Sequence, residues 1–380
     1  MDQERTGRRS HNNHPYIVGF GVNPAFEEAR QRLANRVEEG LTIGDCEHKT
    51  RVLERLGGGS FGEVYLGEEV ESQRRVAVKI EPAHCVVQSL LHEGKVYRKL
   101  QNGRGIPTVH WYGLHGLDFA ALVMELMGPT LYRRWADCKE RFSLKTVLML
   151  ADQMLEVIEH VHANSFVHRD ISPNNFMLGV GDKSDRLHLI DFGHAKEILP
   201  ATVFVPARRH RFSFAQPMVG TPRFASVFTH MGLEPSYRDD MESLGYIWVY
   251  LLKGRLPWQG LRSTDQHSKM DLIAQTKCQT PIEDLCEGLP QEFLVYMNYV
   301  RNLRHLEMPD HAKVREFFRG LAATMDIEYD GKFDWTSEAG SGASDTNSNS
   351  SSSSSSNAQL QSDDADREHP SEKSDTRVSN

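Results

Sequence analysis

Two short motifs, in a fixed order, constrain this chain more than any other feature of its sequence. The tripeptide HRD at residues 168–170 is followed by Asn175, and DFG begins at Asp191, directly after the apolar run LHLI. An amide and a carboxylate brought together in this way can hold Mg²⁺ above the phosphates of a nucleotide, because Mg²⁺ prefers oxygen ligands. Asp170 would then accept or orient the proton of the hydroxyl group that receives the phosphate. Each tripeptide alone occurs by chance in many proteins, so the rest of the chain has to support this interpretation.

A glycine-rich segment precedes these motifs. The stretch LGGGSFGEVYLG contains the spacing Gly57-x-Gly59-x-x-Gly62-x-Val64. Glycines let a backbone approach phosphates without interference from Cβ, and the main-chain amides can bind phosphate oxygens. A glycine-rich hairpin without a ligand is one alternative, and a Rossmann fold also begins with three such glycines. The Rossmann fold needs a helix directly after the loop, whereas EVYLGEEV is typical of a strand, so the pattern favours a hairpin that covers ATP.

A third motif is the apolar strand VAVK, which ends at Lys79. A lysine at the end of a strand could simply be exposed at an edge, but this one stands where a lysine could hold the α and β phosphates of ATP. Such a lysine needs an acidic partner on the next helix, and SLLHEGKVYRKL supplies Glu93 on an expected helix. Glu69 and Glu81 are rival acids, but neither lies on an expected helix. We therefore predict a pair between Lys79 and Glu93.

Composition divides the chain into three parts. Residues 1–49 are predicted to be an N-terminal extension, partly ordered at best, with one short helix around PAFEEARQRLANRVEEG. Residues 50–336 are predicted to fold as an α+β domain, with a small β-rich lobe at about 50–126 and a larger, mainly helical lobe at about 127–336. Residues 337–380 are rich in Ser, Asn and Asp and carry almost no apolar side chains, so we expect a disordered tail.

Charge and cysteine content exclude several classes of protein. The formal net charge of -8 argues against a protein that coats nucleic acid, which would be basic. The five cysteines form no CxxC pair, and an odd number cannot all form internal disulfides, so a reducing compartment is expected. The first residues, MDQERTGRRSHNNHP, lack the apolar core of a signal peptide, and no run of about 18 apolar residues is present. We therefore expect a cytoplasmic or nuclear protein with no nucleic-acid partner and no membrane insertion.

Taken together, the motifs resemble the casein kinase 1 family of serine/threonine protein kinases, from about Leu53 to Trp335. The stretches that carry the resemblance include GIPTVHWYG, VMELMGPTL, FSLKTVLMLADQM, GTPRFASVFTHMGLEPSYRDDMESLGY, LPWQGL and TPIEDLCEGLP. The resemblance implies a bilobal protein-kinase fold with ATP and Mg²⁺ as cofactors. It also implies a monomer that transfers the γ-phosphate of ATP to Ser or Thr of acidic or already phosphorylated proteins.

The resemblance further implies roles for individual residues of this sequence. Those assigned to catalysis are Lys79, Glu93, Asp170, Asn175 and Asp191, of which Asn175 and Asp191 are also the metal ligands. Those assigned to the ATP pocket are Leu56, Gly57, Gly59, Gly62, Val64, Ala77, Lys79, Met124, Glu125, Met127 and Met177, with Met124 as the gatekeeper. Thr221 stands where serine/threonine kinases have a threonine beside the catalytic aspartate, and Arg223 is assigned to substrate phosphate. Asp240 resembles the aspartate that braces the main chain of the HRD motif.

Two positions depart from the family pattern. Ser172 stands where the family has a lysine that contacts the transferring phosphate, so a weakly active or inactive kinase-fold scaffold is the alternative function. Gln266 stands where a lysine normally helps Arg223 to bind a substrate phosphate. A separate basic cluster could be an ordinary exposed run of charge or a docking site for acidic substrates, and its members are Arg208, Arg209 and Arg211.

Overall fold

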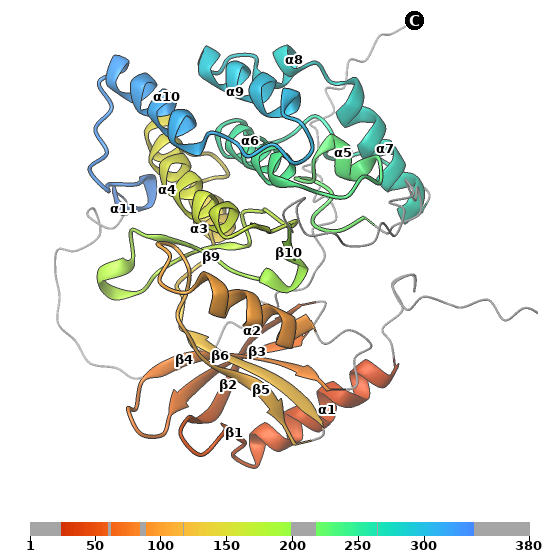
Figure 1. The fold of residues 1–380 in the computed structure, drawn as a ribbon, viewed down its shortest axis with the longest axis vertical. Helices are drawn as coiled ribbons and strands as arrows, with labels where there is room; N and C mark the ends of the chain where they lie inside the picture. Colours follow the sequence, from red (N-terminus) through yellow and green to blue (C-terminus); the bar gives the residue numbers. More distant parts are fainter. Residues whose placement is uncertain are drawn as a thin grey trace, which may run out of the picture.

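A computed structural model describes residues 24–59, 62–83, 89–116, 118–198, 218–263 and 265–337 of the chain. Within these residues the chain forms two lobes, the first built on an antiparallel sheet and the second on helices (Figure 1). The α+β, two-lobed arrangement predicted from the sequence is confirmed. The predictions for the first residues of the N-terminal extension and for the serine-rich tail lie outside the described residues.

The small lobe is a six-stranded antiparallel sheet with the order β1-β2-β3-β4-β6-β5, and two helices pack on it. Each predicted strand in this region is present, because Val-rich segments with turn residues between them pair as consecutive hairpins. The elements of this lobe are α1 Pro24–Glu38, β1 Thr42–Gly44, β2 Lys49–Gly59, β3 Gly62–Glu69, β4 Arg75–Pro82, α2 Ser89–Leu100, β5 Val109–His115 and β6 Phe119–Glu125.

Alternation along β4 gives the sheet two different faces. Val76, Val78 and Ile80 are completely buried in one apolar cluster, whereas the intervening Ala77 and Lys79 belong to the opposite face. Figure 1 shows α1 along the first face and α2 on the second, between the sheet and the large lobe. The face that carries Lys79 is therefore the one turned toward the junction of the lobes.

The small lobe begins earlier in the chain than the sequence predicted. Leu33 of α1 and Ile43 of β1 are buried in the same cluster as the core of β4, and Ile43 pairs with Thr50 of β2. A boundary at residue 50 therefore falls inside the sheet. The helix expected in the extension is present as α1, but its apolar spacing gave no sign of the surface that it covers.

The large lobe is built around two long helices, α4 and α6. Ser143 caps the start of α4, because its side chain accepts a hydrogen bond from the main-chain N of Thr146 at 3.2 Å. Gly254 ends α6 at φ 84°, a left-handed conformation that favours glycine. The helices of this lobe are α3 Leu131–Asp137, α4 Leu144–Ala163, α5 Val227–His230, α6 Tyr237–Lys253, α7 Gln266–Gln279, α8 Ile282–Cys286, α9 Gln291–Asn302, α10 His311–Thr324 and α11 Asp334–Ser337.

Four short strands lie where the large lobe meets the small one. They are β7 Phe166–Val167, β8 Phe176–Leu178, β9 Leu187–Leu189 and β10 Lys196–Glu197. β7 pairs with β10 and β8 pairs with β9, both antiparallel. The HRD motif thus follows β7, and the DFG motif follows β9. Among the described helices, none has the length and apolar character needed to cross a membrane.

Candidate active site

A lysine held by two carboxylates joins the two lobes. Lys79 of β4 donates hydrogen bonds to Glu93 Oε2 of α2 at 2.8 Å and to Asp191 Oδ1, which follows β9, at 2.9 Å. The pair predicted between Lys79 and Glu93 is therefore present, and the rival acid Glu81 is used elsewhere. Its carboxylate accepts hydrogen bonds from the first residues of α2, including the main-chain N of Leu90 at 2.8 Å.

Lys79 and Asp191 stabilise each other's charged forms, whereas burial raises the pKa of Glu93 to about 7. Burial opposes the charge on Lys79, but the carboxylates of Asp191 and Glu93 outweigh it and raise the pKa of the lysine. Burial likewise opposes the charge on Asp191, and the attraction of Lys79 prevails and lowers its pKa. The site therefore presents a permanent cation beside a permanent carboxylate, which is a suitable environment for phosphates and a metal ion.

Three donors orient the carboxylate of Asp170. Its Oδ1 accepts hydrogen bonds from both the main-chain N and the hydroxyl of Thr221, each at 2.8 Å. Its Oδ2 accepts one from Asn175 Nδ2 at 3.1 Å. The predicted neighbour Thr221 thus lies beside the candidate base, although it is far from it in the sequence. A carboxylate held in this way can take or orient the proton of an incoming hydroxyl without first reorganising.

Asn175 and Asp191 fit a divalent metal by the chemistry of their donor atoms. Asn175 uses its amide nitrogen on Asp170, with a second hydrogen bond to the main-chain O of Asp170 at 2.8 Å, so its amide oxygen remains as a metal ligand. The Asp191 carboxylate supplies the other protein oxygen. In the described part of the chain no group of three or more His, Cys, Asp or Glu could hold a metal alone. Such an ion would therefore depend on the phosphates of a bound nucleotide.

A buried aspartate of α6 fixes the main chain of the HRD motif. Asp240 of α6 accepts hydrogen bonds from the main-chain N of His168 at 2.7 Å and of Arg169 at 2.9 Å. Arg169 has φ 74°, an uncommon conformation for a residue other than glycine, and it persists because the surroundings fix it. Asp240 is held in turn by His162 at 3.1 Å, which contacts His311 at 2.9 Å. The bracing role expected for Asp240 agrees with these contacts.

Glu234 is a residue near the site that sequence reasoning missed. One of its carboxylate oxygens lies 3.4 Å from a guanidinium nitrogen of Arg169 and 3.0 Å from the ammonium nitrogen of Lys196. It therefore ties the residue before Asp170 to the strand that follows the DFG motif. Glu234 lies within the stretch GTPRFASVFTHMGLEPSYRDDMESLGY, but nothing in that stretch indicates its partners, since they lie on segments that only the fold brings together.

The strand register places the expected ATP-pocket residues on one face of the sheet. Val64 pairs with Lys79, and Ala77 pairs with Met124, so all four share the face that turns toward the large lobe. Met124 is almost buried, as a gatekeeper would be. Met177 lies on β8 and forms a bridge with Thr130, directly below the connection between the lobes.

The glycine-rich segment forms the hairpin of β2 and β3. Gly59 pairs with Gly62, and Gly57 pairs with Val64. A Cβ on Gly62 would lie 2.4 Å from the carbonyl oxygen of Ile80, so only glycine allows β3 and β4 to approach here. Leu56 is 45% exposed, which leaves it available to a ligand rather than committed to the core.

The remaining predicted residues divide into those that the structure describes and those that it does not. Glu125 and Met127 are half-buried where β6 leads into the large lobe, and Lys183 binds the Glu125 carboxylate at 2.6 Å. Arg223 lies two residues after Thr221, with its guanidinium carbon 5.7 Å from the centre of the Tyr250 ring.

Ser172 is buried, and its carbonyl accepts a hydrogen bond from the main-chain N of Asn175 at 3.0 Å. The basic cluster lies outside the described residues, and its members are Arg208, Arg209 and Arg211.

Comparison with known families identifies the region that contains this site. Residues 50–305 match the family model described as a protein kinase domain, which is about two-thirds of the chain. The matched region begins in β2 and extends beyond α9, so it contains all the candidate catalytic, metal-binding and ATP-pocket residues.

Proposed function

The chain belongs to the protein kinase family, and on that premise we propose that it is an active serine/threonine kinase of casein kinase 1 type. As a protein kinase it uses ATP, a divalent metal ion and protein substrates. The proposal adds that the metal is Mg²⁺ and that the accepted proteins are acidic or already phosphorylated. The observation that carries the proposal is the set of hydrogen bonds around Lys79 and Asp170, in which every catalytic group is present and held by a partner.

The roles of the residues follow from their positions. ATP supplies the phosphoryl group when it is bound, and Asn175 and Asp191 would hold Mg²⁺ against its phosphates. Lys79 neutralises the α and β phosphates, and Glu93 keeps the lysine pointed at them. Asp170 would hold the proton of the substrate hydroxyl, since its carboxylate is oriented by Thr221. Catalysis would therefore rest mainly on positioning and charge, as in other phosphoryl transfers.

Thr221 supports serine and threonine as acceptors. Its hydroxyl and main-chain N both bind Asp170, so the segment that follows it starts directly beside the reacting hydroxyl. Arg223 on that segment supports an acidic or phosphorylated substrate, because guanidinium groups bind carboxylates and phosphates through paired hydrogen bonds. The sequence context of both residues, GTPRFAS, is the stretch that most resembles the casein kinase 1 family.

A kinase-fold scaffold with little activity is the second candidate, and Ser172 is the observation that favours it. A buried serine supplies no positive charge near the γ-phosphate, where the family has a lysine. Against this alternative, Lys79, Asp170, Asn175 and Asp191 are all retained. Lys79 is hydrogen-bonded to Asp191, and Asn175 to Asp170. We therefore propose a slower kinase rather than an inactive one.

An arrayed peptide library with ATP and Mg²⁺ tests activity and preference together. Each peptide should occur in three versions, which carry acidic residues, phosphoserine or alanine upstream of the same Ser or Thr. The proposal predicts labelled acidic and phosphorylated peptides and much weaker labelling of the alanine versions. Equal labelling of all three would contradict the substrate preference. No labelling by a protein that binds ATP would favour the scaffold.

A further inference from the structure

The short segment at residues 222–225, which follows Thr221, has main-chain carbonyls that converge on one side chain. Lys277 Nζ of α7 donates hydrogen bonds to the carbonyl oxygens of Pro222 at 3.0 Å, Arg223 at 3.3 Å and Ala225 at 2.6 Å. The segment has no helix or strand to satisfy these carbonyls. Lys277 thus donates the hydrogen bonds that main-chain N–H groups would donate to these carbonyls in a helix or a strand.

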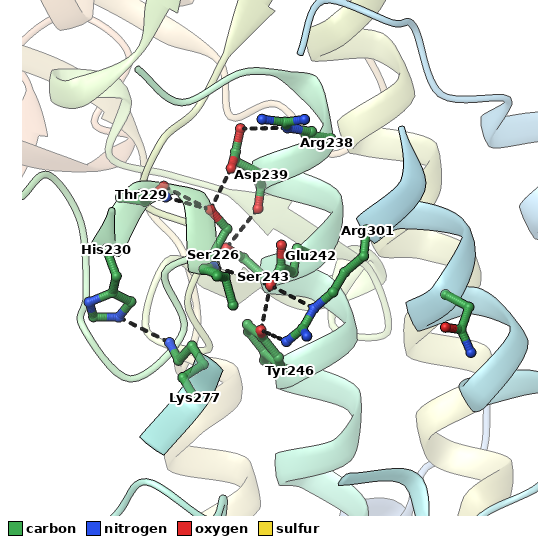
Figure 2. Close-up of polar contacts among 12 residues, drawn as sticks. Ser226, Thr229, His230, Arg238, Asp239, Glu242, Ser243, Tyr246, Lys277 and Arg301 are labelled. Atoms are coloured by element: carbon green, nitrogen blue, oxygen red, sulfur yellow. Dashed lines mark hydrogen bonds and ion pairs between the residues drawn. The ribbon is translucent and has the colours of Figure 1, made fainter. Parts of the chain in front are cut away.

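Lys277 is placed as an anchor rather than as a surface charge. Its side chain is completely buried, and its ammonium lies 4.8 Å from the centre of the Trp258 ring and 5.0 Å from that of Tyr246. An ammonium has three N–H donors and no acceptor, so three carbonyls and two aromatic faces match its needs. Figure 2 shows Lys277 pointing from α7 toward His230 of α5, whose Nε2 lies 3.2 Å from its Nζ.

Two further side chains hold the same carbonyls. Trp258 Nε1 donates a hydrogen bond to the carbonyl oxygen of Arg223 at 2.7 Å, and His230 Nε2 lies 3.1 Å from that of Pro222. Directly after the segment, the main-chain N of Val227 donates to Glu242 Oε1 at 3.2 Å, and Arg301 in turn lies 3.4 Å from the same carboxylate. Figure 2 shows Glu242, Tyr246 and Arg301 close together and joined by dashed lines. The segment is therefore fixed from α5, α6 and α7 together.

The other end of the segment reaches the candidate base. Thr221 donates two hydrogen bonds to Asp170, and Gly220 has φ 90° with room for no Cβ, which would lie 2.5 Å from the carbonyl oxygen of Arg169. Because residues 222–225 directly follow Thr221, we expect a substrate whose hydroxyl reaches Asp170 to lie against them. Whatever fixes the carbonyls of this segment fixes the surface on which the substrate lies.

We propose that Lys277 is a positioning residue for the protein substrate, which it serves by clamping the main chain of residues 222–225. This inference rests on the proposed function, because it concerns the binding of the peptide that receives the phosphate. Lys277 makes no contact with Lys79, Glu93 or Asp191 among the interactions of the described residues, so it should act on the peptide and not on ATP. The effect should appear as a change in KM for one substrate only.

The test compares Lys277→Met with a matched control, Lys253→Met. Lys253 also donates a hydrogen bond to a main-chain carbonyl of the large lobe, that of Leu285 at 2.8 Å, but it lies away from the segment. We expect Lys277→Met to raise KM for an acidic peptide about tenfold or more, through loss of charge-assisted bonds, while KM for ATP changes less than about twofold. Lys253→Met should leave both KM values near those of the wild type.

Two outcomes would overturn the inference. One is a folded Lys277→Met protein whose KM for peptide matches the control, and the other is an equal rise in both KM values. If Lys277→Met does not fold, Trp258→Phe removes one donor to Arg223 and keeps an aromatic side chain, so it should raise KM for peptide in the same direction by a smaller factor. A wild-type protein that hydrolyses ATP but labels no peptide would overturn the proposed function instead, and this inference with it.

Discussion

Lys79 is half-buried and Lys277 is completely buried, and the surroundings of these two lysines are opposite. Lys79 lies between the lobes, and its partners are two carboxylates, one on α2 and one after β9. Lys277 lies within the large lobe, and its acceptors are main-chain carbonyls of one short segment. The carboxylates raise the pKa of Lys79, whereas burial lowers the pKa of Lys277 to about 7.

This difference separates a residue that acts through its charge from one that acts through its hydrogen bonds. A permanent cation beside Asp191 can neutralise phosphates, and breaking such a group leaves an uncompensated buried charge. Lys277 cannot bind a substrate directly, because its N–H groups already donate to main-chain carbonyls of the protein. The region around Lys79 should therefore control ATP and the chemical step, and the region around Lys277 should control the peptide.

The largest effect should come from removing the carboxylate that Lys79 shares with the metal. Asp191→Ala should lower phosphate transfer by about a thousandfold or below detection, because both the metal ligand and one partner of Lys79 are lost. The thermal unfolding temperature should fall only modestly, because Lys79 keeps Glu93 as a partner. Initial rates with labelled ATP measure the first effect, and Asp185→Ala, at an exposed aspartate of the same lobe, is the control. Substantial activity in Asp191→Ala would refute the metal site.

A smaller loss is expected at the base itself. Asp170→Asn keeps an oxygen that can accept the hydrogen bonds from Thr221, but it cannot take a proton. We expect kcat to fall about a hundredfold or more, with the Kd for ATP unchanged because Lys79 is untouched. Calorimetry for ATP binding and steady-state rates check the two parts. Full activity in a linear initial-rate assay would mean that the role given to Asp170 is wrong.

The charge near the γ-phosphate can also be restored. Ser172→Lys should raise kcat about tenfold to a hundredfold with little change in KM for ATP, because a cation there acts mainly in the transition state. Ser172→Met, which has similar length and no charge, separates the effect of charge from that of volume at this buried position. An unchanged or lower kcat in a folded Ser172→Lys protein would show that the site is built around serine.

The smallest expected effect is a pH dependence of KM for peptide, which follows the protonation of Lys277. Below about pH 7 its ammonium donates three hydrogen bonds, and above that pH the neutral amine has only two N–H groups. KM for peptide should therefore rise severalfold between about pH 6 and pH 8.5, while KM for ATP follows a flatter profile. The groups that act on Lys277 are Glu242 and Cys278, which favour its proton, and Arg301, which opposes it. The imidazole of His230 also faces it, with Nε2 3.2 Å from Nζ.

The lowered pKa of Lys277 also predicts how the free energy of unfolding depends on pH. Because the pKa of Lys277 in the folded protein is about 7 and its ordinary value is 10.5, the unfolded chain binds more protons between these values. The free energy of unfolding should therefore gain a contribution that rises with pH in this window, by about 1.4 kcal/mol per pH unit at most. Denaturation of wild type and Lys277→Met at matched pH measures it. Parallel curves for the two proteins would contradict the shift.

The region around Lys79 was largely predictable from the sequence, and the region around Lys277 was not. Lys79, Asp170, Asn175 and Asp191 lie in short motifs, because the chemistry of phosphates and metals demands particular residues at particular spacings. The strands and the cap of α4 also followed from local patterns, since apolar alternation and Ser143 act over a few residues.

The clamp on residues 222–225 depends instead on where helices pack. Lys277 stands in α7, whose sequence has no strong apolar face, and nothing there indicates a buried lysine. Glu234 was missed for the same reason, because its partners Arg169 and Lys196 come from other segments. The packing of α1 on the sheet was also unpredicted, since an amphipathic helix shows that it has a buried face but not which surface covers it.

Transfer of the terminal phosphate of ATP to protein is the most direct test of the central claim. Wild type and Asp191→Ala are incubated with ATP labelled at the γ-phosphate, Mg²⁺ and casein as an acidic acceptor, and the labelled amino acids are then identified. We expect label on serine and threonine, none on tyrosine, and none at all with Asp191→Ala or without the metal. A folded wild-type protein that binds ATP and transfers no label, or that labels tyrosine, would contradict the account.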